Sequence, residues 1–129
     1  MAGARVLVVD DDPFVLGIVA MVLQRAGYET VAAPGPLQAL ETIKARGSFD
    51  LVVSDIVMPV MCGTELASQI RLLSPSSKIM LMTGCASEGQ IPKDLPFVGK
   101  PFSPSDLLGA VERVLQSSAP PRSIAATPT

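Results

Sequence analysis

Two patterns of hydrophobic and polar positions alternate along this chain. Unbroken apolar runs are typical of strands buried on both faces of a parallel sheet, and they predict strands at residues 5–10, 51–55, 78–82 and 97–99. A short alternating run predicts another strand at 28–33. Apolar residues three and four positions apart predict helices at 13–26, 37–46, 64–73 and 103–115.

This order of elements predicts an α/β fold, a doubly wound five-stranded parallel sheet with helices on both faces. Right-handed crossovers bring the carboxyl ends of the strands to one edge of the sheet, where open α/β folds bind ligands. The length of 129 residues is that of one domain. We assign residues 1–116 to it and expect 117–129, rich in Ser, Ala, Pro and Thr, to be a disordered tail or linker.

Two segments carry more detailed expectations. In the helix at 64–73, Thr64 is expected to cap the amino end, with Leu66, Ile70 and Leu73 facing inward. The segment 85–95 has little helical periodicity. A helix between the fourth and fifth strands is therefore expected to be short or missing.

Composition excludes several classes of function. The chain has no histidine, which rules out Ser-His-Asp and Cys-His catalysis and His-ligated zinc. A net charge of −2 without a basic patch argues against nucleic acid as a partner. No apolar run approaches the roughly 20 residues that span a bilayer, and no signal peptide is visible. With two cysteines, we expect a cytoplasmic protein whose thiols are free.

Polar residues end four of the predicted strands. Three aspartates, Asp10 to Asp12, follow the first strand, and Asp55 ends the third. Like charges repel one another when they are clustered, so folding alone gives no reason for the triplet. Mg²⁺, which takes oxygen ligands, would relieve the repulsion, whereas a solvated turn in which one Asp caps the next helix is the simpler alternative. Thr83 and Lys100 end the fourth and fifth strands.

The order and spacing of these motifs over about residues 4 to 116 resemble those of the bacterial two-component response-regulator receiver domains (CheY-like). The resemblance rests on Asp10-Asp11, on Asp55 with Met58-Pro59 and Gly63, on Thr83, and on Lys100-Pro101-Phe102. It implies a flavodoxin-like sheet with strand order 2-1-3-4-5. The Lys-Pro-Phe-Ser-Pro ending also resembles receivers attached to hybrid histidine kinases.

The resemblance also implies roles for single residues. Asp55 would accept a phosphoryl group from a phosphohistidine, acting as a phosphoacceptor rather than a turnover enzyme. Lys100 would pair with Asp55 and then with a phosphoryl oxygen, its bond to Pro101 being cis, and Thr83 would bind another oxygen. Thr83 and Phe97 would form the conformational switch. The implied Mg²⁺ ligands are Asp10 (through water), Asp11, Asp55 and the backbone carbonyl of Val57, which leaves Asp12 to cap the helix.

The implied partners are a sensor histidine kinase or a histidine phosphotransfer protein, with a kinase or effector domain possible in the same chain. Val57 and Cys85 flank the site, where relatives often carry polar side chains that act on an attacking water. With neither an acid nor an amide there, we expect slow self-dephosphorylation. Cys62, where the family often has Asp or Asn, is expected to be a small buried residue that fills space rather than a redox group.

Two other functions fit parts of the pattern. A haloacid-dehalogenase-like phosphohydrolase also uses an aspartyl nucleophile after its first strand, but Phe14 replaces the expected Thr or Val and no acidic pair follows Lys100. A receiver-like module that binds a partner without being phosphorylated is the other alternative. A P-loop NTPase is excluded because the chain has no glycine-rich phosphate loop with Lys-Ser/Thr.

Overall fold

The computed structural model describes residues 3–84 and 95–117. Its five strands form one parallel sheet in the order β2-β1-β3-β4-β5, as the resemblance implied. The strands are β1 (Arg5–Val9), β2 (Glu29–Ala33), β3 (Leu51–Asp55), β4 (Lys78–Thr83) and β5 (Phe97–Gly99). The helices are α1 (Pro13–Arg25), α2 (Pro36–Arg46), α3 (Gly63–Leu73) and α4 (Pro104–Gln116).

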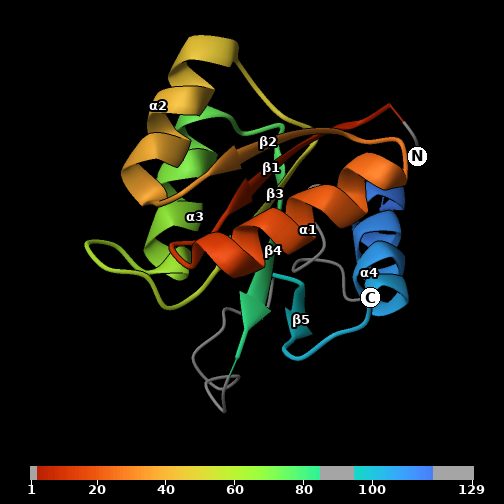
Figure 1. Cartoon of the computed structure of the whole chain (residues 1–129). Coiled ribbons are helices and arrows are strands. Elements are labelled where there is room, and N and C mark those ends of the chain that lie inside the picture. The colour runs from red at the N-terminus through yellow and green to blue at the C-terminus, as the bar shows by residue number, and fades with distance from the viewer. Residues whose placement is uncertain (1–2, 85–94, 118–129) are drawn as a thin grey trace.

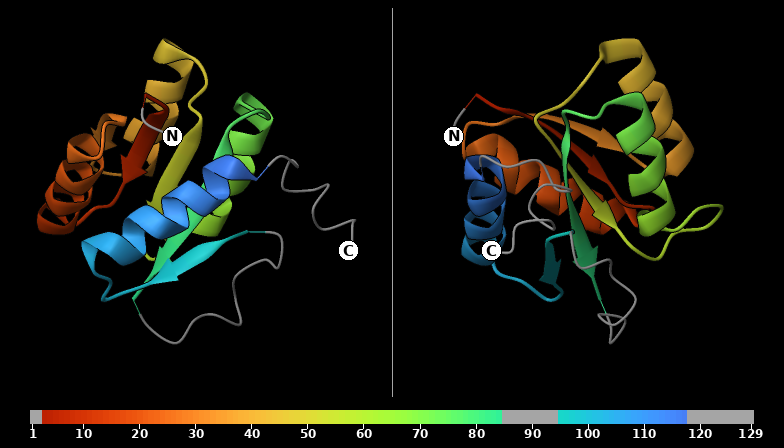
Figure 2. Two further views of the ribbon diagram at one scale, coloured as in Figure 1. Left: turned by 90° about the vertical axis from the view of Figure 1, so that its right-hand side faces the viewer. Right: turned by 180° about the vertical axis from the view of Figure 1, so that it is seen from behind.

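The sheet separates two layers of helices (Figures 1 and 2). Helices α2 and α3 cover one face and pack on a cluster that includes Leu7, Val52 and Leu81. Helices α1 and α4 cover the other face and pack on a cluster that includes Val8 and Val53. Because successive side chains of a strand point to opposite faces, each central strand supplies both clusters and reads as an unbroken apolar run.

The predicted elements are confirmed, with shifts of one residue at several ends. β1 ends at Val9 and leaves Asp10 as the first residue beyond the strand, whereas β4 extends one residue further, to Thr83. No helix in the described part of the chain has the length and apolar character that a membrane crossing needs. Two predictions fall outside the described residues: the short or missing helix, most of whose segment is 85–94, and the tail at 118–129.

Two predictions about α3 are wrong. Its N-cap is Cys62, which makes no capping hydrogen bond with its side chain, so Thr64 lies within the first turn instead of before it. Leu73 is 42% exposed, whereas Leu66, Ala67 and Ile70 are buried. Along α3 the buried stripe ends with Ile70, and the next buried residue is the C-cap, Ser74.

Candidate functional site

Parallel pairing places the ends of four adjacent strands at one edge of the sheet. Asp55 pairs with Met82, and Thr83 pairs with Gly99, so β3, β4 and β5 end at neighbouring levels. Val9 pairs with Ser54, which puts the residue after β1 beside the end of β3. The structure therefore brings together the predicted site residues, Asp10, Asp55, Thr83 and Lys100.

Three carboxylates form the centre of this site. One side-chain oxygen from each of Asp10, Asp11 and Asp55 lies within 4.8 Å of the others. Asp10 is fully buried, Asp55 is 9% exposed, and Asp11 is open to solvent. Such a set of oxygen atoms, half-buried and open on one side, fits a hard divalent cation that keeps some of its water ligands.

Asp12 is separated from this cluster by its hydrogen bonds. Its Oδ1 accepts from the backbone N–H groups of Phe14 at 2.9 Å and Val15 at 3.5 Å, which makes it the N-cap of α1. Its own N–H donates to Asp10 Oδ1 at 2.9 Å and so orients that buried carboxylate. The predicted role of Asp12 as the helix cap is therefore confirmed.

Replacing Asp12 with alanine is expected to lower the free energy of unfolding by about 1 kcal/mol, because an N-cap side chain satisfies otherwise unpaired N–H groups. Urea unfolding measures this loss, and Asp12→Ser, which keeps a capping oxygen, is the control. Mg²⁺ affinity, measured by calorimetry, should change little in both variants. A loss of Mg²⁺ binding in the serine variant as well would place Asp12 among the metal ligands.

Lys100 carries the positive charge of the site. Its Nζ lies 3.3 Å from Asp55 Oδ1 and 3.4 Å from Asp10 Oδ2, and its backbone N–H donates to the Thr83 carbonyl at 2.6 Å. The pairing with Asp55 was predicted, whereas the pairing with Asp10 was not. The peptide bond between Lys100 and Pro101 is cis, as expected.

The surroundings of Asp55 disfavour its charge. Burial first, and then the charge of Asp10, raise the pKa of the Asp55 carboxyl above its ordinary value. Lys100 and the Ile56 N–H, which donates to Asp55 Oδ1 at 2.9 Å, oppose that rise. Asp55 is thus a buried acid beside a like charge, an arrangement common at functional sites.

Ser54 supports Asp55 from within β3 and was missed in the sequence. Its hydroxyl is buried and donates to the Asp55 carbonyl at 2.9 Å. A single hydroxyl in an otherwise apolar strand, directly before Asp55, was the signal that could have identified it. The hydroxyl holds the peptide group whose N–H faces the Asp55 carboxylate.

Gly63 packs closely against the backbone of Asp55 and Ile56. A Cβ atom at position 63 would lie 2.2 Å from the Asp55 carbonyl oxygen and 2.9 Å from the Ile56 Cα. The Gly63 N–H donates to the Ile56 carbonyl at 2.7 Å and draws the start of α3 against the end of β3. The sequence motif includes this glycine because no larger residue allows that approach.

The loop between β3 and α3 corrects one prediction. Cys62 is exposed, so it is not a buried residue that fills space. Its sulfur lies 3.1 Å from the Thr64 hydroxyl, and this contact is the main cause of the lowered pKa of the thiol.

Two valines of the same loop are exposed, Val57 by 67% and Val60 by 79%. Val60 has a φ of 76°, which β-branched residues rarely adopt. Cys85 lies outside the described residues.

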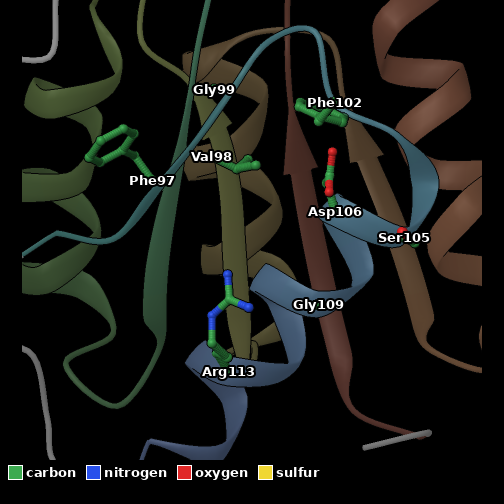
Figure 3. Close-up of a pocket in the computed structure, with 8 residues that line it drawn as sticks. All are labelled: Phe97, Val98, Gly99, Phe102, Ser105, Asp106, Gly109 and Arg113. Carbon is green, nitrogen blue, oxygen red and sulfur yellow. The ribbon is translucent and has the colours of Figure 1, made fainter.

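The two predicted switch residues lie on the last two strands. Thr83 is buried at the end of β4, and Phe97 is 43% exposed at the start of β5. Figure 3 shows Phe97 pointing away from α4, while Val98 points toward it.

Between β5 and α4 lies an open groove of about 420 Å³, lined by Phe97, Val98, Gly99, Phe102, Ser105, Asp106, Gly109 and Arg113.

Comparison with known proteins gives a consistent result. Residues 6–112 match the family model described as the response regulator receiver domain. The response regulator receiver protein CpdR of Brucella abortus is 33% identical over 116 residues, a match covering 86% of this chain and 96% of that protein. The sensor kinase CckA of the same organism is 34% identical, but the match covers 88% of this chain and only 13% of the kinase.

A solved structure supports the same relationship. The response regulator TrrA of Thermotoga maritima, in complex with Mg(2+)-BeF, is 32% identical and superposes with a TM-score of 0.77. The match covers 86% of this chain and 98% of that one. The likeness therefore extends over almost the whole of the response regulator that was solved in that complex.

Proposed function

The chain belongs to the response-regulator receiver family, and on that premise we propose that Asp55 is the residue that accepts the phosphoryl group. It is a receiver domain of a two-component system, a class of phosphoacceptor proteins. The observation that carries the assignment to Asp55 is its position: a buried carboxylate at the end of β3, 3.3 Å from Lys100 and next to two further carboxylates.

In the proposed reaction, a carboxylate oxygen of Asp55 attacks the phosphorus atom of a phosphohistidine on the partner. A P–O bond to Asp55 forms as the P–N bond breaks, and the imidazole leaves. Lys100 favours the ionised form of Asp55 that attacks, and then pairs with a phosphoryl oxygen. Thr83, at the end of the neighbouring strand, would donate its hydroxyl hydrogen to another phosphoryl oxygen, so that the switch residues sense the new group.

Asp10, Asp11 and Asp55, with the backbone carbonyl of Val57, would hold Mg²⁺. A bound Mg²⁺ would neutralise charge on the phosphoryl oxygens, the main requirement of in-line phosphoryl transfer. The structure supports this role through the spacing of the three carboxylates. Asp10, whose oxygens already accept from Asp12 and Lys100, would contribute through water.

Receiver domains work with histidine kinases or phosphotransfer proteins, and a partner of that class is part of this proposal. The match within CckA shows that similar receivers occur inside longer kinases, so an attached kinase or effector domain is a second possibility. We also place the domain in the cytoplasm, where an exposed thiol such as Cys62 stays reduced. The dehalogenase-like phosphohydrolase is not favoured, because the family match covers residues 6–112.

The test is phosphorylation by a small donor. Incubation with acetyl phosphate and Mg²⁺ should add one phosphoryl group to the intact chain, detected by mass spectrometry, and Asp55→Asn should add none. Chelation of Mg²⁺ should also prevent the addition. If the wild-type chain stays unmodified, the binding module that is never phosphorylated becomes the better assignment; repeated hydrolysis of phosphate esters would instead support the phosphohydrolase.

Once formed, the phosphoryl group should persist, because the side chain of Val57 offers no polar atom to hold an attacking water. Val57→Asn is expected to increase the rate of hydrolysis by about tenfold, less than the roughly hundredfold or more that a positioned acid or base contributes, because an amide only orients the water. The rate is measured as loss of the added phosphoryl mass after the donor is removed.

Val60→Asn is the matched control, since it adds the same amide to the same loop, and asparagine tolerates the positive φ at that position. Its hydrolysis rate should stay near that of the wild type. A half-life of seconds for the wild-type phosphoprotein in Mg²⁺ would contradict the prediction.

A further inference from the structure

The carboxyl end of α4 is held by a lysine of the sheet. Lys78 Nζ donates to the Leu115 carbonyl at 2.9 Å and also to the Ser117 carbonyl. Lys78 is the first residue of β4 and lies 37 and 39 positions before these two partners in the chain. The last carbonyl groups of a helix have no partner within the helix, so the lysine supplies hydrogen bonds that α4 cannot make by itself.

The sheet fixes the position of Lys78. Its backbone N–H donates to the Asp50 carbonyl at 3.2 Å, and it pairs with Leu51 of β3. Its side chain is half-buried, and its ammonium group meets the negative end of the α4 dipole, where a cation is favoured. Both partners are backbone carbonyls, so the contact acts on the path of the chain at the end of the helix.

The two ends of α4 are secured in different ways. At the amino end, Ser103 and Asp106 form a capping box, an arrangement within four consecutive residues. At the carboxyl end, the C-cap Ser117 has an extended backbone, and its N–H donates to the Val114 carbonyl at 3.1 Å. Local contacts therefore start the helix, whereas Lys78 ties its end to a distant part of the sequence.

The end of α4 has little apolar support of its own. After Val111, Leu115 is the one buried residue of the helix, and Ser117 is the last residue of the described range. Helix ends with few buried apolar contacts open at a small fraction of the free energy of global unfolding. The lysine contact thus lies where an additional hydrogen bond changes the local stability most.

We propose that Lys78 is a latch, formed by its contacts with the Leu115 and Ser117 carbonyls, that sets where the rigid part of the domain ends. With the latch closed, the last turn of α4 moves with β4, and the boundary lies at Ser117. With the latch open, the boundary retreats by about one helical turn. A domain attached beyond Ser117 would keep a fixed direction in the first case and swing more widely in the second. This inference goes beyond the proposed function, since no step of phosphoryl transfer involves Lys78.

Hydrogen–deuterium exchange of the full chain, measured by mass spectrometry, tests the latch. Lys78→Met keeps the apolar part of the side chain and removes the ammonium group. Exchange in a peptide covering 112–117 is expected to become about tenfold faster, the effect of losing a hydrogen bond from a charged donor. Asp12→Ala, which lowers stability at the cap of α1, should leave the exchange of this peptide unchanged, because local opening does not depend on global stability.

Two further variants separate charge from side-chain packing. Lys78→Arg keeps a cation with several N–H donors, and its exchange should stay close to that of the wild type. Lys44→Met makes the same change in net charge on the exposed side of α2 and should have no effect on the peptide. If Lys78→Met does not fold, Lys78→Gln replaces it, since glutamine keeps N–H donors without the charge.

Equal exchange in the wild type and in Lys78→Met would overturn the latch. An equal acceleration in Asp12→Ala or in Lys78→Arg would do the same, because the effect would then come from global unfolding or from side-chain shape. Phosphoryl incorporation from acetyl phosphate should be the same in Lys78→Met as in the wild type. The exchange experiment uses no phosphoryl donor, so its outcome is independent of the assignment of Asp55.

Discussion

Alanine at position 63 is expected to destabilise the domain by about 3 kcal/mol, the upper end of the usual cost of overpacking. The added methyl group would overlap the Asp55 carbonyl oxygen, at 2.2 Å, and would press on the Ile56 Cα. Both contacts are with backbone, which cannot rotate away, so α3 and the end of β3 must separate. The same movement displaces Asp55, and phosphoryl incorporation from acetyl phosphate should fall with the stability.

Urea unfolding of Gly63→Ala beside Gly17→Ala tests this explanation. Gly17 is an exposed residue of α1, and a Cβ atom there meets no other atom within 4 Å. Its replacement by alanine should therefore stabilise the domain by up to about 1 kcal/mol through helix propensity. If both alanine variants shift stability in the same direction, close approach is not the reason for Gly63.

Asparagine at position 55 is expected to raise the melting temperature of the metal-free domain while it abolishes phosphorylation. Burial and the charge of Asp10 raise the pKa of Asp55, so the folded state holds the proton of this carboxyl more tightly than the unfolded state. As pH rises from below the ordinary value of 3.8 through the raised pKa, ionisation removes stability from the fold. The asparagine side chain of the variant has no such ionisation to undergo.

The difference in melting temperature between Asp55→Asn and the wild type should therefore be small near pH 3. It should reach its full size above the raised pKa of Asp55. Thermal melts between pH 3 and pH 8 in a chelating buffer measure it. Asp11→Asn is the comparison, since Asp11 is the exposed member of the cluster and its charge is screened by water. Added Mg²⁺ should reduce the advantage of Asp55→Asn. A melting temperature below that of the wild type at neutral pH would contradict the prediction.

The sequence predicted the sheet and the site because both follow from periodicity. A polar residue at the end of an apolar run must lie at the carboxyl edge of the sheet once the strands are parallel. The strand order that the resemblance implied then places Asp10, Asp55, Thr83 and Lys100 at the ends of adjacent strands. The cap at Asp12 followed from the resemblance, which assigned Asp10 and Asp11 to the metal and left Asp12 before the helix.

The remaining features depend on three-dimensional details that no local pattern contains. Exposure of Cys62 and Leu73 depends on where α3 begins and ends. The contact between Lys100 and Asp10 joins the residues that directly follow two non-adjacent strands, β5 and β1, across the ends of β4 and β3. Only the twist and register of the whole sheet decide whether a side chain spans that gap.

The shortness of β5 has a consequence for how the site moves. Within the described residues β5 is the shortest strand, with three residues, and it lies at the edge of the sheet, pairing with β4 alone. Short, exposed edge segments open locally at a small fraction of the free energy of global unfolding. Lys100 directly follows this strand, so the charge that bridges two buried acids is carried next to a short edge strand. Moving Lys100 toward a phosphoryl oxygen would then require only local opening of this edge.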